Sequence, residues 1–201
     1  DELNQLLEAT VTACQVPSRP LLAPQAGRDQ QPVVLVASGP SLDEALPWLQ
    51  HHQNDLQIVA SGSSLGVLMR NGIRPAAAVF LERSSTVHDT DLMELIQEGV
   101  DLSGVPLMGS MTLDPRIHHH FGPVAWFHRP LSTTLALFPD EAPSKLLQSG
   151  PQSANAALEA LLHLGHRRVL LIGCDFSAAK RSKPRAEQAL GVSPRRLDLP
   201  L

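Results

Sequence analysis

The chain has 201 residues, of which 43% are hydrophobic and 18% charged, so it can fold as one domain around a substantial core. A net charge of −4 and an aromatic content of 3%, with no tyrosine, argue against a surface that binds nucleic acid. No apolar run approaches the roughly 18 residues of a membrane span, and the two cysteines, Cys14 and Cys174, indicate reduced thiols in a cytoplasmic protein.

Helical and strand patterns alternate along most of the chain. Residues 1–15 carry apolar side chains at helical spacing, and residues 16–32 are rich in proline and polar residues, which is typical of a linker. Beyond them the expected strands are residues 33–37, 57–60, 76–81, 105–109, 123–127 and 168–172. The expected helices are residues 41–51, 64–71, 88–98 and 153–164.

This alternation predicts the fold class and the domain boundaries. Apolar runs separated by helices are typical of an α/β fold with an open, mainly parallel, Rossmann-like sheet and helices on both faces. We therefore assign residues 33–177 to a Rossmann-like nucleotide-binding domain, which follows the N-terminal helix (1–15) and the linker (16–32). Residues 178–201 are rich in Lys and Arg, and we expect them to form a basic, flexible tail within a longer chain.

Small polar residues follow several of the expected strands. Ligands bind beyond the carboxyl ends of the strands in parallel sheets, so these residues are the candidates for a binding site. They are Ser38-Gly39-Pro40-Ser41, Ser61-Gly62-Ser63, Gly173-Cys174-Asp175 and, before the last helix, Gln152-Ser153. Gly39 would let the backbone approach a ligand, Pro40 would stiffen the turn, and the hydroxyl of Ser41 would face the ligand.

A purely structural role competes with a binding role at each stretch. Ser41 is a good N-cap for the helix that follows it, and Ser61 to Ser64 could cap the next helix. Asp43 and Glu44 already complement the positive end of the first of these helices, which disfavours a phosphate on its axis and favours a sugar or a base. The sequence has neither a Gly-x-Gly-x-x-Gly motif nor a phosphate-loop lysine, so the common dinucleotide and ATPase sites lose support.

Carboxylates and histidines are the remaining candidates for catalysis. Glu82 and Asp175 each follow an expected strand, where a carboxylate caps a turn or binds a sugar hydroxyl, a metal ion or a proton. Adjacent residues such as His118-His119-His120 fan out by about 100° on a helix, so we expect a solvated turn and no metal site there. His128 is a single candidate acid or base, and Cys174 is expected to be a small buried hydrophobe.

Three segments of the chain, taken together, resemble a known family. They read LVASGPSLDEALPWL, IVASGSSLGVLMRNGIRPAAAVFLER and SGPQSANAALEALLHLGHRRVLLIGCDFS. In this order they are similar to the motility accessory factor family, whose core domain is shared with the archaeal 6-hydroxymethylpterin diphosphokinases. The resemblance covers about residues 33–177 and includes the turn from Gly72 to Pro75. The Gly-Pro-Ser opening is also similar to that of bacterial sialyltransferases that use CMP-sialic acid.

The resemblance implies the core of a nucleotide-sugar glycosyltransferase, which transfers a nonulosonic acid from a CMP-sugar to Ser or Thr of a protein, with flagellin as the implied acceptor. Asp175 and Glu82 would be the polar groups at the reacting centre, one of them acting as base; many relatives have Asp in place of Glu82. The resemblance also implies contacts with the nucleotide sugar. Gly39, Pro40 and Ser41 would lie under the nucleotide, and Ser61, Gly62 and Ser63 would lie beside its ribose or base. Gln152 and Ser153 would contact the nucleotide sugar from the other side, and Gly173 lies in the turn before Asp175.

Two other functions are compatible with the same residues. A 6-hydroxymethylpterin diphosphokinase would transfer diphosphate from ATP and would need Mg²⁺ on Asp175 and Glu82, with the basic tail on the phosphates. The sparse carboxylates and aromatic residues count against it, and the glycosyltransferase hypothesis names no cofactor. The third possibility is a module that binds a nucleotide sugar or a flagellar partner without turnover.

Overall fold

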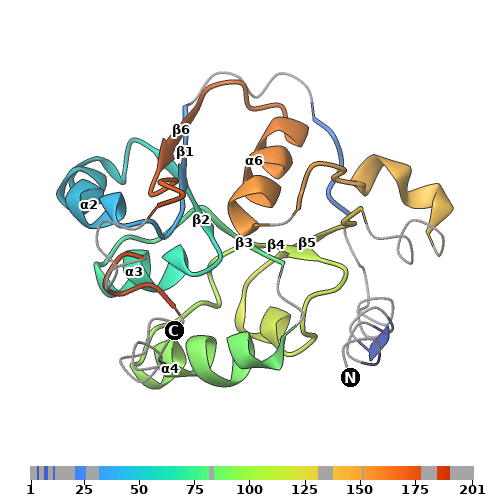
Figure 1. Cartoon of the computed structure of the whole chain (residues 1–201), viewed down its shortest axis with the longest axis horizontal. Helices are drawn as coiled ribbons and strands as arrows, with labels where there is room; N and C mark the ends of the chain where they lie inside the picture. The colour runs from blue at the N-terminus through green and yellow to red at the C-terminus, as the bar shows by residue number, and fades with distance from the viewer. Residues whose placement is uncertain are drawn as a thin grey trace.

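A six-stranded parallel sheet forms the centre of the molecule. In this computed structural model, the residues described are 4, 7–8, 11, 21–25, 32–81, 84–130, 138–150, 152–177 and 185–190. The strands lie in the order β5-β4-β3-β2-β1-β6, and every neighbouring pair is parallel (Figure 1). The predicted fold class, an open α/β sheet with helices on both faces, is therefore confirmed.

All six predicted strands are present, with small shifts of their ends. They are β1 (Val33–Val36), β2 (Gln57–Ser61), β3 (Ala77–Phe80), β4 (Leu107–Ser110), β5 (Val124–Phe127) and β6 (Val169–Ile172). The four residues of β1 are 0% to 1% exposed, because β1 lies inside the sheet and both of its faces are covered. A continuous apolar run is what such a strand requires.

The helices largely match their predicted ranges. They are α2 (Ser41–His52), α3 (Ser64–Arg70), α4 (Met93–Gln97) and α6 (Ser153–His163), with short helices η1 (Val87–Leu92), η2 (Ile117–His120) and η3 (Pro139–Ser144). The helix predicted over 88–98 instead begins with π-helical turns in η1 and continues as α4. Within η1, the hydroxyl of Thr90 donates a hydrogen bond to the carbonyl oxygen of Thr86 at 2.6 Å. Such bonding from Ser or Thr to the preceding turn bends helices.

The helices form two layers, one on each face of the sheet. Side chains alternate along β1, so Val34 and Val36 pack in a cluster with α2, α3 and α4, while Val33 and Leu35 pack in a second cluster with α6. Figure 1 shows α6 on the opposite side of the sheet from α2 and α3. None of the helices formed by the described residues is both long and apolar enough to cross a membrane.

The order of the strands reverses at β1 and β6. The chain moves outward from β1 to β5 and then returns, through α6, to β6 on the other side of β1. β1 therefore lies between β2, which follows it in the chain, and β6, which is reached only by the long return connection. In open α/β sheets this switch point is where ligands bind, so the residues that follow β1 and β6 are the first candidates for a ligand site.

Candidate functional site

The turns that follow β1 and β6 are joined through Asp175 and Ser41. Val36 of β1 lies opposite Ile172 of β6, so the two turns run side by side. Asp175 Oδ2 accepts a hydrogen bond from the backbone N–H of Ser41 at 2.8 Å, and its Oδ1 accepts one from the Ser41 hydroxyl at 2.5 Å. Both carboxylate oxygens are thus oriented, while each retains a second lone pair with which to accept a bond from a ligand.

Two glycines allow this close approach. Gly39 donates its N–H to the carbonyl oxygen of Gly173 at 2.8 Å. A Cβ on Gly39 would lie 2.4 Å from Asp175 Oδ2, and a Cβ on Gly173 would lie 2.1 Å from the carbonyl oxygen of Ala37. Gly173 also has a φ of +69°, which favours glycine. The space that a side chain on residue 39 would need is therefore filled by Asp175 and Gly173.

Ser41 begins α2 but does not cap it, so our N-cap prediction was wrong. Pro40 occupies the N-cap position, and no side-chain hydrogen bond from that residue caps the helix. The carboxylate of Asp175 binds the N–H of Ser41 instead, and it brings a negative charge to the positive end of the helix. The sequence missed this arrangement because the capping group comes from a residue that is 134 positions away.

The turn after β2 is connected to the turn after β1 through hydroxyl groups. Ser63 donates a hydrogen bond from its hydroxyl to that of Ser38 at 2.8 Å. Ser64 is fully buried; its Oγ donates to the carbonyl oxygen of Val36 at 2.7 Å and accepts from the N–H of Ser61 at 3.0 Å. Gly62, with a φ of +53°, makes the sharp turn between Ser61 and Ser63. Ser38, one of the small polar residues that the sequence placed after β1, thus joins the two turns.

Residues 185–190 pack against the same two turns. Ala186 donates its N–H to the carbonyl oxygen of Ser38 at 2.8 Å, and Leu190 donates to that of Ser63 at 2.9 Å. Arg70 of α3 donates to the carbonyl oxygen of Gln188 at 2.8 Å. Ala186 and Leu190 are 0% and 3% exposed. This part of the basic segment (178–201) therefore contributes a wall beside the carboxyl ends of β1 and β2, a role that its composition did not indicate.

Two residues beside Asp175 have unusual environments. Burial, and secondly the negative charge of Asp175, raise the pKa of the Cys174 thiol, so this cysteine is a poor nucleophile. Phe176 has a φ of +50°, and its side chain is 71% exposed. Backbone conformations of this kind are uncommon for a bulky residue and give no signal in the sequence.

The remaining predicted site residues lie at the start of α6 or outside the described residues. Gln152 and Ser153 begin α6, on the face of the sheet opposite α2 and α3. The loop before them is fixed by Asn155, whose side-chain amide donates to the carbonyl oxygen of Gly150 at 2.9 Å. Glu82, the second predicted catalytic residue, lies outside the described residues.

The predicted histidines occupy structural positions. His120 faces His88, with 3.1 Å between their Nε2 atoms, and burial lowers the pKa of both His118 and His120. His128 is 0% exposed and forms a hydrogen bond with Glu141. Within the described ranges, no three His, Cys, Asp or Glu side chains are arranged to hold a metal ion.

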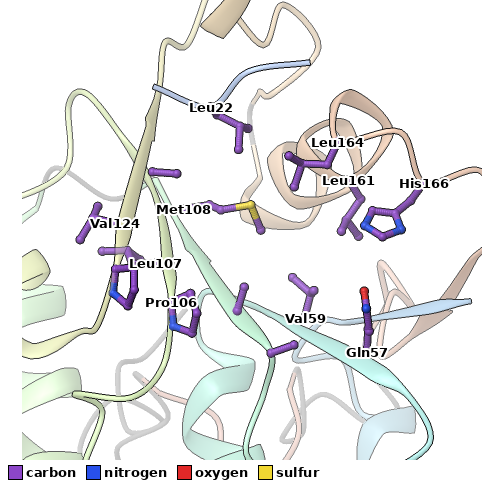
Figure 2. A pocket seen from close by; sticks show the side chains of 14 residues that line it. Leu22, Gln57, Val59, Pro106, Leu107, Met108, Val124, Leu161, Leu164 and His166 are labelled. Atoms are coloured by element: carbon purple, nitrogen blue, oxygen red, sulfur yellow. The ribbon is translucent and has the colours of Figure 1, made fainter. Parts of the chain in front are cut away.

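A pocket of about 530 Å³ lies at the opposite, amino end of the strands. Figure 2 shows Leu161 and Leu164 on one side of it and Leu107, Met108 and Val124 on the other. The polar side chains of its lining are Gln57 and His166. The pocket is thus far more apolar than the turns around Asp175 and Ser41, and it offers few groups to a charged ligand.

Comparisons with known proteins agree with this fold. Residues 4–181 match the sequence model of a family described as 6-hydroxymethylpterin diphosphokinase MptE-like. The structure is similar to that of the MAf glycosyltransferase from Magnetospirillum magneticum AMB-1, with a TM-score of 0.80 and 28% sequence identity over 88% of this chain. The chain spans 28% of the length of that protein. No curated protein matches the sequence.

Proposed function

Because this chain belongs to the 6-hydroxymethylpterin diphosphokinase MptE-like family, we propose that it is the nucleotide-binding core of a glycosyltransferase. The proposed reaction transfers a nonulosonic acid from a CMP-sugar to a Ser or Thr hydroxyl of an acceptor protein such as flagellin. The observation that carries the proposal is the carboxylate of Asp175, which Ser41 orients at the junction of β1 and β6. The likeness to a protein described as a glycosyltransferase supports the type of reaction.

The nucleotide is proposed to lie over the turns that follow β1 and β2. Hydroxyl and backbone groups of Gly39, Pro40 and Ser41 would lie under it, and the turn from Ser61 to Ser63 would flank its ribose or base. The linked hydroxyls of Ser38 and Ser63 support this placement, because they hold the two turns at a fixed separation. Gln152 and Ser153, at the start of α6, would meet the sugar from the other face of the sheet.

Asp175 is proposed to act as general base in the transfer. The acceptor hydroxyl oxygen attacks the anomeric carbon of the donor sugar, the bond between that carbon and the phosphate oxygen breaks, and CMP departs with the electron pair. The hydroxyl proton passes to the carboxylate of Asp175. Fixed orientation of a base toward the reacting oxygen is what general-base catalysis requires. Glu82 stays a second candidate for this role.

Ligand binding tests the proposal first. CMP at about 100 times its dissociation constant should stabilise the protein by about 2.7 kcal/mol, which a thermal-shift titration detects, and it should do so without Mg²⁺. Asp175→Asn should then lower the rate of transfer from a CMP-nonulosonate by about 100-fold or more, as expected for loss of a general base. Asp55→Asn, in the turn after α2, is the control. Transfer at the wild-type rate by Asp175→Asn would remove Asp175 as the base.

The family description favours one further candidate function. A 6-hydroxymethylpterin diphosphokinase would let the hydroxymethyl oxygen of the pterin attack the β-phosphorus of ATP, with AMP as the leaving group. That reaction needs Mg²⁺ to neutralise the phosphates, and Asp175 would be one ligand. Stabilisation by ATP with Mg²⁺ but not by CMP, together with complete loss of activity in excess EDTA, would favour this function over sugar transfer.

A further inference from the structure

Phe176 directly follows Asp175 and combines two features that do not stabilise the free protein. Its φ of +50° makes it the single non-glycine residue with a positive φ among the described residues. L-residues other than glycine avoid this conformation because their Cβ approaches the backbone too closely. Its side chain is 71% exposed, whereas the phenylalanines of the core, Phe80, Phe121 and Phe127, are 7% exposed or less. Strained residues of this kind cluster at ligand sites.

The backbone just before Phe176 is held firmly in place. Gly173 accepts the N–H of Gly39, and Asp175 accepts two hydrogen bonds from Ser41. Phe176 therefore projects from an anchored segment at the junction of β1 and β6, not from a free loop. An exposed ring on a fixed backbone loses little conformational freedom when a ligand covers it, which favours binding.

The side chains that form hydrogen bonds at this junction are polar. The turns after β1 and β2 offer the hydroxyls of Ser38, Ser41 and Ser63 and the carboxylate of Asp175. These groups suit a ribose and a sugar, but they cannot stack on a flat base. The other exposed aromatic residue, Trp48, lies on α2, and the centroid of its ring is 5.0 Å from that of the His52 ring. Phe176 supplies the flat aromatic face that the polar groups of the junction lack.

We propose that the ring of Phe176 is the surface on which the nucleobase stacks when a nucleotide occupies the junction of β1 and β6. The inference rests on the proposed function, because it presupposes a nucleotide at that place. Stacking on an aromatic ring tolerates different bases, so Phe176 would strengthen binding, and hydrogen bonds from other groups would select the base.

The test compares nucleotide affinities of three variants by isothermal titration calorimetry. Phe176→Asn removes the ring but tolerates a positive φ, so the fold should be kept and the melting temperature should not fall. Phe176→Leu keeps an apolar side chain without a stacking face, and Phe176→Trp enlarges that face. CMP should bind about 10-fold more weakly to the Asn and Leu variants than to wild type. The dissociation constant of the Trp variant should lie within about 3-fold of the wild-type value. Trp48→Ala is the control and should bind CMP normally.

Ribose 5-phosphate, which has no base, separates stacking from a general disturbance of the site. Its affinity should be the same for wild type and for all three variants. Equal losses of affinity for CMP and ribose 5-phosphate would overturn the proposal, since Phe176 would then act by positioning Asp175. Unchanged CMP binding in Phe176→Asn would overturn it as well, while the proposed function would stand. Failure of wild-type protein to bind any nucleotide would refute the proposed function itself.

Discussion

The two ends of the parallel sheet are built from different residues. At the carboxyl ends of β1, β2 and β6, serines, glycines and Asp175 form a connected set of hydrogen bonds between turns that are distant in the sequence. At the amino ends of β2 to β5, leucine, valine, methionine and proline side chains line the pocket of about 530 Å³. Both lie on one sheet, but the first is rich in hydrogen-bonding groups, whereas the second is lined mainly by apolar side chains.

This difference is the reason that we place the proposed nucleotide site at the carboxyl ends of the strands and not in the apolar pocket. A nucleotide sugar carries phosphate and many hydroxyl groups, and burying them among apolar side chains without partners is costly. The carboxyl-end turns provide donors and acceptors that are already held in place, so less ordering is required on binding. Substitutions at the carboxyl end should therefore change ligand binding, whereas substitutions at the amino end should change stability alone.

The largest effect is expected from Gly173→Ala. The added Cβ would meet the carbonyl oxygen of Ala37 at 2.1 Å, and φ is +69°. Gly72→Ala is a matched control, because Gly72 also has a φ of +69° but an added Cβ there would have no atom within 4 Å. We expect Gly173→Ala to lower the free energy of unfolding by about 3 kcal/mol or more, and Gly72→Ala by about 1 kcal/mol, in urea denaturation.

The difference between these two variants isolates the contact between the β1 and β6 turns. If Gly173→Ala and Gly72→Ala lowered the free energy of unfolding equally, the effect of Gly173→Ala would come from the positive φ alone, and the contact with Ala37 would add nothing to it. CMP binding should also fail in Gly173→Ala and persist in Gly72→Ala, because only the first substitution displaces the turn that carries Asp175.

A smaller loss is expected from Leu161→Ala at the amino end. Leu161 is 2% exposed, packs in the core cluster beneath α6 and lines the pocket (Figure 2). Truncation should lower the free energy of unfolding by about 2 to 3 kcal/mol, whereas Leu162→Ala, at a neighbouring position that is 43% exposed, should change it by about 0.5 kcal/mol or less. CMP affinity, measured by calorimetry, should be unaffected in both. If Leu161→Ala lost CMP affinity and Leu162→Ala did not, the ligand would bind in the apolar pocket. The proposed difference in role between the two ends of the sheet would then be wrong.

The sequence predicted the sheet well because the strands are local apolar runs. The four residues of β1 and the apolar spacing of α6 need no distant information, and their positions agree with the structure. The order of small polar residues after the strands also indicated the end of the sheet at which the connected turns lie. Side-chain periodicity and turn residues are sufficient for both inferences.

The details of the site could not be predicted, because they depend on contacts between distant residues. Ser41 looked like an N-cap, since nothing nearby in the sequence revealed that Asp175 would bind its N–H. Likewise, nothing near Gly39 in the sequence revealed that Asp175 and Gly173 would fill the space beside it. The packing of residues 185–190 on the turns after β1 and β2 was hidden for the same reason. No local pattern in the sequence predicts the positive φ of Phe176.

A smaller loss of stability than that of Leu161→Ala is expected from Ser41→Ala, which tests the carboxyl end most directly. It removes the hydroxyl that donates to Asp175 Oδ1 but leaves the backbone N–H that donates to Oδ2. Because Ser41 is exposed, the free energy of unfolding should fall by only about 0.5 to 1 kcal/mol. The carboxylate would then be free to rotate about its remaining bond, so the rate of transfer from the CMP-sugar should fall by a larger factor than the loss of stability explains. Ser41→Thr keeps a hydroxyl and should restore transfer, whereas equal transfer by Ser41→Ala and wild type would show that Asp175 needs no orientation by Ser41.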